Sequence, residues 1–368
     1  MTISECTPEE QYDYISNQHG GYWRYDFVDH NYLYNLYFPP EEYLDHLRDH
    51  VKQLVLNYPM AQKDLAALVG DLISQPAERI VVGNGAAELI KIITGMNRKI
   101  IVPVPSFNEY VNAGPADNVV LFDLPEPSFQ LDVDEFAAAA IRSKAELAIV
   151  VSPNNPTSLL VPKEDLLRLV KLLAPHNCML IVDESFIDFA KSSVDETLEN
   201  VIENHQNLTI FKSMSKAYGI CGIRIGYMLT ANVEFLEKVR RGLHIWNING
   251  FAEEFLRLAP QYKERFSASC ETVKADRDLF YKQLCSIPGM VVYPPDANYI
   301  FCRLPNNSMS GPELTKKLFV KHNIYIKHCV GKTMPASDRY LRIASRTPKE
   351  NKLLVEAVTN ILAGASQS

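Results

Sequence analysis

A lysine, two serine hydroxyls and an arginine lie together in one glycine-containing stretch, Lys212-Ser-Met-Ser-Lys-Ala-Tyr-Gly-Ile-Cys-Gly-Ile-Arg-Ile-Gly226. A lone lysine is ordinarily a solvated surface cation. Lys216, however, follows an apolar run and precedes glycines that permit sharp turns. Burial and cationic neighbours would lower the pKa of its amine and make the neutral form available for covalent chemistry. We therefore predict that Lys216 is a nucleophile.

Polar or aromatic side chains also follow three other apolar runs. Phe107 lies in Pro105-Ser-Phe-Asn-Glu-Tyr110, Asn155 lies in Ser152-Pro-Asn-Asn-Pro-Thr157, and Asp183 begins Asp183-Glu-Ser-Phe-Ile-Asp188. Each segment alone could be a simple turn, because Pro, Asn and Asp favour turns. Ligands of open α/β sheets bind beyond the carboxyl ends of the strands. We therefore expect the ring, the amide and the carboxylate on one rim of a sheet.

A turn with two glycines precedes a helical pattern in Gly83-Asn-Gly-Ala-Ala-Glu-Leu-Ile-Lys91. Free N–H groups at the start of a helix attract phosphate, so Ala86 and Ala87 are candidate donors. A turn without a ligand is the alternative. A nicotinamide-binding interpretation also stays open and predicts NADH binding, although its fingerprint would need a third glycine where Glu88 stands.

Short apolar runs alternate with helical patterns between residues 79 and 229. The runs are Arg79–Val82, Lys99–Val104, Leu147–Val151, Met179–Val182, Leu208–Phe211 and Ile223–Leu229. This alternation is typical of βαβ units, and continuous apolar strands fit a sheet covered on both faces. We predict an α/β fold with a mostly parallel mixed sheet flanked by helices.

The remaining sequence predicts a smaller α+β unit and an arm. Residues 251–285 have the spacing of a long amphipathic helix. Four apolar runs, at 289–293, 299–303, 324–326 and 339–343, predict strands before a helix near 348–363. The aromatic-rich segment 22–40 is weakly patterned, as expected of an arm lying on other structure. We predict an N-terminal arm (1–44) joining the small domain, a large domain (45–247) and a C-terminal small domain (248–368).

Composition narrows the classes of partner. The hydrophobic content of 47% and charged content of 22% are ordinary for a globular protein. A formal net charge of -7 argues against nucleic acid. No basic leader pattern follows Met1, and no window approaches about eighteen apolar residues, so neither secretion nor a membrane span is expected. The 7 cysteines contain no Cys-x-x-Cys pair, which indicates a reducing cytoplasm and no metal site.

The ordered series of motifs resembles class I/II aminotransferases of pyridoxal phosphate (PLP) fold type I, over nearly the whole chain. The resemblance is carried by Ser213-Met-Ser-Lys-Ala-Tyr-Gly-Ile-Cys-Gly-Ile-Arg224, Asn154-Asn-Pro-Thr157 and Asp183-Glu-Ser-Phe186. Within that superfamily the chain is similar to histidinol-phosphate aminotransferase and threonine-phosphate decarboxylase, through His19-Gly-Gly21 and Tyr340-Leu-Arg-Ile-Ala-Ser-Arg346. The resemblance implies a large PLP-binding domain and a substrate carrying phosphate or phosphonate.

The resemblance also implies a role for each residue of the cofactor site. Lys216 resembles the Schiff-base lysine and proton shuttle, and Asp183 the partner of the pyridine nitrogen. Asn155 resembles the amide that donates to the ring oxygen, and Phe107 the aromatic ring stacked on the pyridine. The implied phosphate site consists of Ala86, Ala87, Ser213, Ser215 and Arg224. Tyr58, in Asn57-Tyr-Pro59, matches a tyrosine that reaches the partner's cofactor, which implies a homodimer.

On the substrate side, Arg342 resembles the arginine that binds the substrate carboxylate. Arg346 stands where histidinol-phosphate aminotransferases usually have glycine, and with Lys327 it is a candidate for a distal phosphate or phosphonate; surface roles for both stay open. Phe186 departs from the pattern, because many aminotransferases have a tyrosine there that donates to the ring oxygen. Threonine-phosphate decarboxylases share the phenylalanine.

The leading hypothesis is transamination of a small phosphate- or phosphonate-bearing amine or amino acid, with aminoethylphosphonate and histidinol phosphate as candidates. It requires a small-molecule amino donor and acceptor. Decarboxylation of a phosphorylated amino acid stays open, because the orientation of the substrate selects the bond that breaks. A catalytically silent binding protein on the same fold is a third hypothesis, against which the complete set of Lys216, Asp183, Asn155 and Arg224 speaks.

Overall fold

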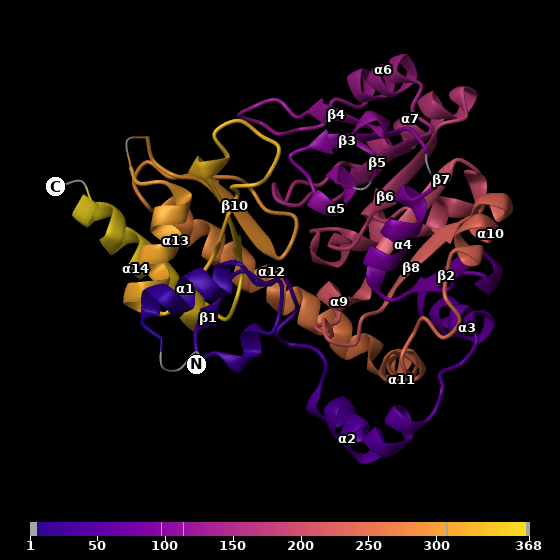
Figure 1. The fold of residues 1–368 in the computed structure, drawn as a ribbon, viewed down its shortest axis with the longest axis horizontal. Helices are drawn as coiled ribbons and strands as arrows, with labels where there is room; N and C mark the ends of the chain where they lie inside the picture. Colours follow the sequence, from indigo (N-terminus) through magenta and orange to yellow (C-terminus); the bar gives the residue numbers. More distant parts are fainter. Residues whose placement is uncertain (1–5, 97, 113, 307, 366–368) are drawn as a thin grey trace.

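The computed structural model describes residues 6–96, 98–112, 114–306 and 308–365. Met1–Glu5, on which the expectation about a leader depends, lie outside these ranges. Figure 1 shows a larger part built around one sheet and a smaller part that holds both ends of the described chain. Helix α12 (Lys263–Cys285) runs between the two parts.

The larger part contains, in the described residues, a seven-stranded sheet with the order β2-β8-β7-β6-β5-β3-β4. Its strands are β2 (Ile80–Gly83), β3 (Ile100–Val104), β4 (Val119–Asp123), β5 (Leu147–Val151), β6 (Met179–Asp183), β7 (Leu208–Ser213) and β8 (Gly226–Thr230). The strand β8 is antiparallel to both of its neighbours, and the other pairings are parallel. The predicted α/β fold with a mostly parallel mixed sheet is confirmed.

Helices cover both faces of this sheet because successive strand side chains point to opposite sides. In β5, Ala148 and Val150 pack into one core cluster, whereas Ile149 and Val151 pack into the other. The helices of the larger part are α2 (Glu41–Leu56), α3 (Gln62–Ile73), α4 (Gly85–Thr94), α5 (Asn108–Val111), α6 (Val133–Ser143), α7 (Lys163–Leu173), α8 (Ser193–Glu196), α9 (Met214–Ala217), α10 (Val233–Arg241) and α11 (Gly250–Leu258). This two-sided burial explains the continuous apolar runs in the sequence.

The smaller part packs three helices against an antiparallel sheet with the order β12-β13-β10-β9. Its strands are β9 (Val291–Val292), β10 (Tyr299–Arg303), β12 (Lys327–His328) and β13 (Tyr340–Ala344), and its helices are α12, α13 (Gly311–His322) and α14 (Pro348–Ala365). The N-terminal arm joins this part: α1 (Pro8–Ser16) lies against α13, and β1 (Val28–Asp29) pairs in parallel with β11 (Ile324–Tyr325).

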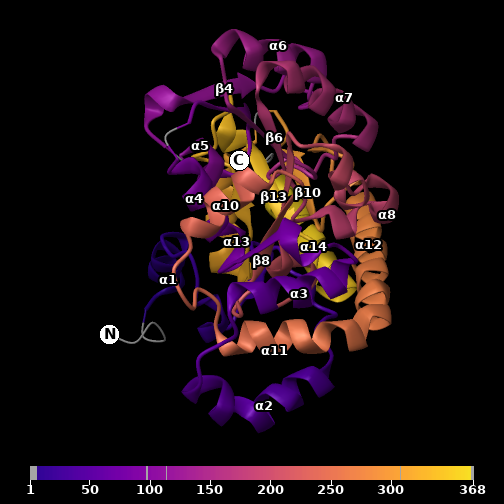
Figure 2. The same ribbon diagram turned by 90° about the vertical axis from the view of Figure 1, so that its right-hand side faces the viewer.

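The helix expected over residues 251–285 is interrupted. Helix α11 ends at Leu258, and Pro260 lies in a short 3-10 turn before α12 begins, as expected where proline cannot continue the hydrogen-bond ladder. Figure 2 shows α11 between α2 and α3, two helices of the larger part, which it contacts. The predicted domain boundary at residue 248 therefore stays a prediction.

Three further properties bear on function. None of the helices in the described ranges is long and apolar enough to cross a membrane. The cysteines are free, and four of them, Cys178, Cys270, Cys302 and Cys329, are buried. The described residues contain no group of three or more His, Cys, Asp or Glu side chains that could hold a metal ion.

Candidate active site

The predicted site residues meet at one edge of the seven-stranded sheet. Strands β2, β3, β5, β6 and β7 end at this edge, and β8 begins there, as the pairing of Gly226 with both Gly83 and Ser213 shows. Because β8 is antiparallel, Arg224, which precedes it, reaches the same edge as the residues that follow the other strands. A cavity of about 350 Å³ lies here.

The cavity is lined by residues of the large sheet, the small part and the N-terminal arm. They are Gln18, His19, Tyr22, Asn31, Tyr32, Leu33, Ala86, Ala87, Ile90, Phe107, Val151, Asn155, Asp183, Ser185, Phe186, Ser213, Lys216, Arg224, Lys327 and Arg342. The sequence predicted ten of these residues as site residues. The arm residues among them were not predicted, and only His19, in the His-Gly-Gly motif, carried a signal.

Lys216 lies in the single turn α9, directly after β7. Burial is the main cause that lowers the pKa of its amine; Cys221 opposes this effect, Arg342 and Arg224 add to it, and Asp183 opposes it slightly. Nζ of Lys216 has no hydrogen bond or ion pair within the described ranges. The amine therefore has no protein partner that would compete with a ligand in the cavity.

Lys212, four residues earlier, has the opposite environment. Its Nζ lies 3.1 Å from Oδ1 of Asp188. Burial alone would lower its pKa, but Asp188, Glu199 and Glu184 together raise the pKa of Lys212 above the ordinary value. Of the two lysines in this stretch, Lys212 is a structural cation, whereas Lys216 faces the cavity.

Asp183, at the end of β6, supplies a buried carboxylate to the floor of the cavity. Oδ2 accepts a hydrogen bond from the Tyr110 hydroxyl at 2.8 Å, and Oδ1 accepts one from the Ser185 N–H at 2.9 Å. Burial raises the pKa of Asp183, while the hydrogen bonds from Ser185 and Tyr110 oppose that rise. The sequence did not predict Tyr110 as a partner, although Tyr110 ends the motif that contains Phe107.

Aromatic and amide groups surround the centre of the cavity. Phe107 and Asn155 line it, as predicted. Oδ1 of Asn155 accepts a hydrogen bond from Nη1 of Arg342 at 3.2 Å, so its amide N–H groups remain for another acceptor. Phe186 also lines the cavity and packs edge-on against Tyr299, with ring centroids 5.1 Å apart. Its ring offers no hydrogen-bond donor.

One end of the cavity is suited to a phosphate. Ala86 and Ala87 lie in the first turn of α4, and Arg224 and Ser213 lie beside them. Gly85 has a φ of 67°, a conformation that favours glycine, and a Cβ there would come within 2.5 Å of Nη2 of Arg224. Arg224 has a φ of 63°, an uncommon conformation for a non-glycine residue.

Ser215 is not part of the cavity wall. It is fully buried, and its hydroxyl accepts a hydrogen bond of 3.4 Å from Nη1 of Arg224. Nη1 also donates to the Cys221 carbonyl at 3.2 Å. Ser215 is therefore placed to support Arg224 rather than to contact a ligand itself.

The donor set fits pyridoxal phosphate at each of its functional groups. A buried carboxylate (Asp183) suits the pyridine nitrogen, an unpaired lysine amine (Lys216) suits the aldehyde, and a guanidinium with helix N–H groups (Arg224, Ala86) suits the phosphate dianion. These groups lie around one cavity rather than in separate places.

The wall formed by the small part carries two cations. Arg342, in β13, donates through Nη2 to the carbonyl of Asn31 at 2.8 Å and through Nη1 to Asn155. The side-chain amine of Lys327, in β12, has no hydrogen bond or ion pair to any described residue. Burial and Arg342 lower the pKa of Lys327. Both side chains face the cavity without a carboxylate partner.

Besides Ser215, two predicted residues lie outside the cavity. Arg346 forms an ion pair of 3.0 Å with Glu350 and donates to the Asp29 carbonyl at 2.8 Å. Tyr58 is 75% exposed and stacks on Trp246, with ring centroids 4.0 Å apart. The structure does not bring Arg346 to the substrate side of the cavity. The role predicted for Tyr58 depends on a second copy of the chain and stays a prediction.

The family of sequences described as aminotransferase class I and II matches residues 35–358. CMP-5'-(3-aminopropyl)phosphonate synthase from Streptomyces rubellomurinus is 42% identical over 97% of this chain and 56% of its own length. L-serine phosphate decarboxylase from Sulfurospirillum multivorans is 30% identical over 84% of this chain and 81% of its own. Histidinol-phosphate aminotransferase from Clostridium acetobutylicum has a similar structure, with a TM-score of 0.82 and 28% identity over 92% of this chain and 99% of that one.

The match covers only part of the length of the Streptomyces rubellomurinus synthase. The chain spans 56% of that synthase and 57% of protein y4rO from Sinorhizobium fredii, so it covers a little over half of each.

Proposed function

The chain belongs to the class I and II aminotransferase family and uses pyridoxal phosphate, and on this premise we propose that it decarboxylates a small α-amino acid bearing phosphate or phosphonate. The proposal departs from the transamination predicted from the sequence. It depends on the charges on the substrate side of the cavity and on the kinds of enzyme to which the chain is similar.

Pyridoxal phosphate, when bound, withdraws electrons from the α-carbon of an amino substrate, so that a bond at this carbon can break. Asp183 is placed to hold a proton on the pyridine nitrogen, because its carboxylate is buried and already fixed by Tyr110 and Ser185. Arg224 and the N–H groups at the start of α4 would hold the phosphate. Asn155 would donate its amide N–H to the ring oxygen.

Lys216 has two duties in this proposal. Its amine would hold the cofactor covalently between turnovers, and after the substrate arrives it would be free to move a proton. In decarboxylation it would deliver that proton to the α-carbon once carbon dioxide has left. The lowered pKa of Lys216 suits both duties, because the amine must be neutral to bond and must then exchange a proton near neutral pH.

The observation that carries the substrate class is the pair of cations, Arg342 and Lys327, which line the cavity without an ion pair to any described carboxylate. Two partly buried cations beside one another are unfavourable unless an anion neutralises them. An amino acid whose side chain carries phosphate or phosphonate brings two acidic groups. Histidinol phosphate brings one.

The type of reaction is supported by the similar enzymes. L-serine phosphate decarboxylase is named for loss of the carboxylate, and CMP-5'-(3-aminopropyl)phosphonate synthase is named for an amine that carries phosphonate. For this chain, 2-amino-4-phosphonobutyrate is a chemically matched candidate, because replacing its carboxylate by hydrogen gives 3-aminopropylphosphonate. Phe186 carries no hydroxyl that could donate to the ring oxygen of the cofactor, and the absence of this donor is compatible with the proposed decarboxylation.

Transamination remains the second candidate. It is favoured by the family match and by the similarity to histidinol-phosphate aminotransferase over nearly the whole chain. The same lysine would serve it, by moving the proton from the α-carbon to the cofactor. The two reactions differ in the bond that is broken, and therefore in their products.

The test is to incubate the holoenzyme, without any oxo acid, with O-phospho-L-serine, O-phospho-L-threonine, 2-amino-4-phosphonobutyrate and the CMP ester of the last compound. Released carbon dioxide and the amine product are measured together, with Lys216→Ala as the inactive control. The proposal predicts equal amounts of carbon dioxide and amine over many turnovers. Conversion of the cofactor to its amine form, with an oxo acid product and no carbon dioxide, would contradict it and favour transamination.

A further inference from the structure

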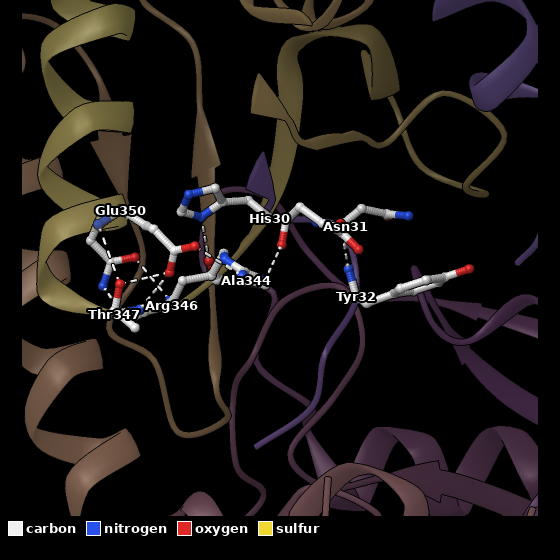
Figure 3. A network of polar contacts seen from close by, with 9 residues as sticks. His30, Asn31, Tyr32, Ala344, Arg346, Thr347 and Glu350 are labelled. Carbon is white, nitrogen blue, oxygen red and sulfur yellow. Dashed lines mark hydrogen bonds and ion pairs between the residues drawn. The ribbon is translucent and has the colours of Figure 1, made fainter. Parts of the chain in front are cut away.

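The N-terminal arm runs antiparallel to β13 and the residues that follow it. Three successive arm residues contact every second residue on the other side. Arg342 donates to the carbonyl of Asn31 at 2.8 Å, and Arg346 donates through Nη1 to the carbonyl of Asp29 at 2.8 Å. Between them, the N–H of Ala344 donates to the carbonyl of the intervening arm residue at 2.8 Å. Figure 3 shows the part of this row that runs from Glu350 and Arg346 through Ala344 to His30 and Asn31.

His30 fixes the centre of the row from both sides. Its carbonyl accepts the hydrogen bond from Ala344, and its Nδ1 lies 2.8 Å from the Ala344 carbonyl, to which it donates as the neutral ring. Its own N–H donates to the Tyr325 carbonyl at 2.8 Å. The arm is therefore held between β13 and β11 at this residue.

Arg346 is itself held in place by α14. Its Nη2 lies 3.0 Å from Oε1 of Glu350, four residues later, and the other carboxylate oxygen of Glu350 accepts a hydrogen bond of 2.6 Å from the Thr347 hydroxyl (Figure 3). The side chain of Arg346 is 14% exposed and that of Glu350 is 24% exposed. With Nη2 held by Glu350, Nη1 of the same guanidinium donates to the carbonyl of Asp29 on the arm.

The side chain of Asp29 connects the contact with Arg346 to the arm residues that line the cavity. Its Oδ1 accepts hydrogen bonds from the N–H of Asn31 at 2.7 Å and of Tyr32 at 3.2 Å, so the three residues form a tight turn. Asn31 and Tyr32 line the cavity. The carbonyl and Oδ1 of Asn31 both accept from Nη2 of Arg342, at 2.8 and 3.2 Å.

We propose that Arg346, braced by Glu350, is a positioning residue that holds the arm so that Asn31 orients the Arg342 guanidinium toward an acidic group of the substrate. Arg346 does not itself contact the substrate. This inference rests on the proposed function in one respect, namely that the ligand of Arg342 is an anion. It replaces the direct role that the sequence predicted for Arg346.

The test measures anion binding by the holoenzyme, independently of turnover. Sulfate serves as the probe because its charge does not change near neutral pH, and its binding is followed through the absorbance of the bound cofactor. In Arg346→Met the dissociation constant for sulfate should rise about tenfold, while the dissociation constant for pyridoxal phosphate stays within about twofold of wild type. Arg346→Lys should recover part of the sulfate affinity, because it keeps a donor for the Asp29 carbonyl.

Lys352 provides the matched control. It pairs with Glu356 on the same helix with the same spacing, but at 3.9 Å and with both side chains more than half exposed. Lys352→Met should leave both dissociation constants unchanged. Glu350→Gln offers a milder change to the brace itself, in case Arg346→Met does not fold, and should raise the sulfate dissociation constant less than Arg346→Met.

The inference would be overturned by a sulfate affinity equal to wild type in folded Arg346→Met and Glu350→Gln, or by an equal loss of sulfate and cofactor affinity. A wild-type holoenzyme that does not bind sulfate at this site would also overturn it. Release of carbon dioxide plays no part in this experiment. The proposed reaction can therefore fail while the positioning role of Arg346 is supported, and the reverse is equally possible.

Discussion

The hydroxyl of Tyr110 donates a 2.8 Å hydrogen bond to Oδ2 of Asp183, and both side chains are buried. The two residues come from different strand ends, since α5 follows β3 and Asp183 ends β6, with β5 between them. The Tyr110 hydroxyl, a neutral donor, therefore holds the carboxylate that we expect to contact the pyridine nitrogen.

Replacing Tyr110 by phenylalanine should weaken cofactor binding. The pKa of Asp183, which burial already raises, would rise further without this donor, so the carboxylate would hold the protonated pyridine less well. A hydrogen bond to a charged group contributes about 1.5 kcal/mol, so the dissociation constant for pyridoxal phosphate should rise about tenfold. Titration of the apoenzyme, followed by fluorescence, measures this constant.

Tyr43 offers the control for that change. Its hydroxyl is also buried, but it has no hydrogen-bond partner among the residues that the structure describes. Tyr43→Phe should leave the dissociation constant for the cofactor unchanged. If Tyr110→Phe behaves in the same way, Tyr110 has no part in holding Asp183 for the cofactor.

Stability in mild acid should depend on His30. Burial lowers the pKa of His30 to about 4 from 6.5. A folded-state pKa below the unfolded one means that stability is fully present above pH 6.5 and is lost as the pH falls toward 4. The shift corresponds to about 3 kcal/mol. In urea unfolding at several pH values, the free energy of unfolding should therefore fall less steeply toward acid pH for His30→Asn than for wild type, because asparagine cannot take up this proton.

The exposed His176 is the matched control, because the same substitution there changes a side chain that is in water in both states. His176→Asn should keep the wild-type pH dependence. Identical acid profiles for wild type and His30→Asn would mean that His30 is not kept neutral by the fold.

Anion binding should weaken as Lys332 loses its proton. Its Nζ donates to the Ser106 carbonyl at 2.6 Å, which links the small part to the loop that carries Phe107. Burial, followed by Arg342 and Lys327 and against the effect of Cys329, lowers the pKa of Lys332 to about 7. The dissociation constant for sulfate should rise by up to about tenfold between pH 6 and pH 8 in wild type.

The variant Lys332→Met should bind sulfate weakly at pH 6, with little change up to pH 8. The pair of profiles isolates the contribution of Lys332, since sulfate keeps a constant charge in this range. A pH dependence in Lys332→Met equal to that of wild type would assign the effect to another group.

The strand-end residues could be predicted from the sequence because the strands are buried on both faces. Continuous apolar runs marked β5, β6 and β7, so Asn155, Asp183 and Lys216 stood out as the polar residues that follow them. Strand β4 was not predicted, although its sequence contains the apolar run Val119–Phe122. It lies at the edge of the sheet, and its residues are partly or fully exposed.

Residues whose role depends on contacts between distant segments could not be placed in this way. The spacing of Arg346 and Glu350 was visible in the sequence, but the position of the arm, and hence of Asp29, was not. Tyr110 needed the strand order before its contact with Asp183 could be seen. For Arg346, a family comparison indicated a cation near the substrate, and the structure instead gives it a partner on the arm.

The proposed chemistry depends most on the assignment of the cofactor to Lys216. The holoenzyme should be treated with borohydride, which reduces the carbon–nitrogen double bond between cofactor and lysine to a stable link, and the peptides should be mapped by mass spectrometry. We expect the reduced cofactor on Lys216 and none on Lys212, whose amine is paired with Asp188. Cofactor attached to Lys212 or to another lysine, or no attachment in a fully loaded enzyme, would contradict this assignment.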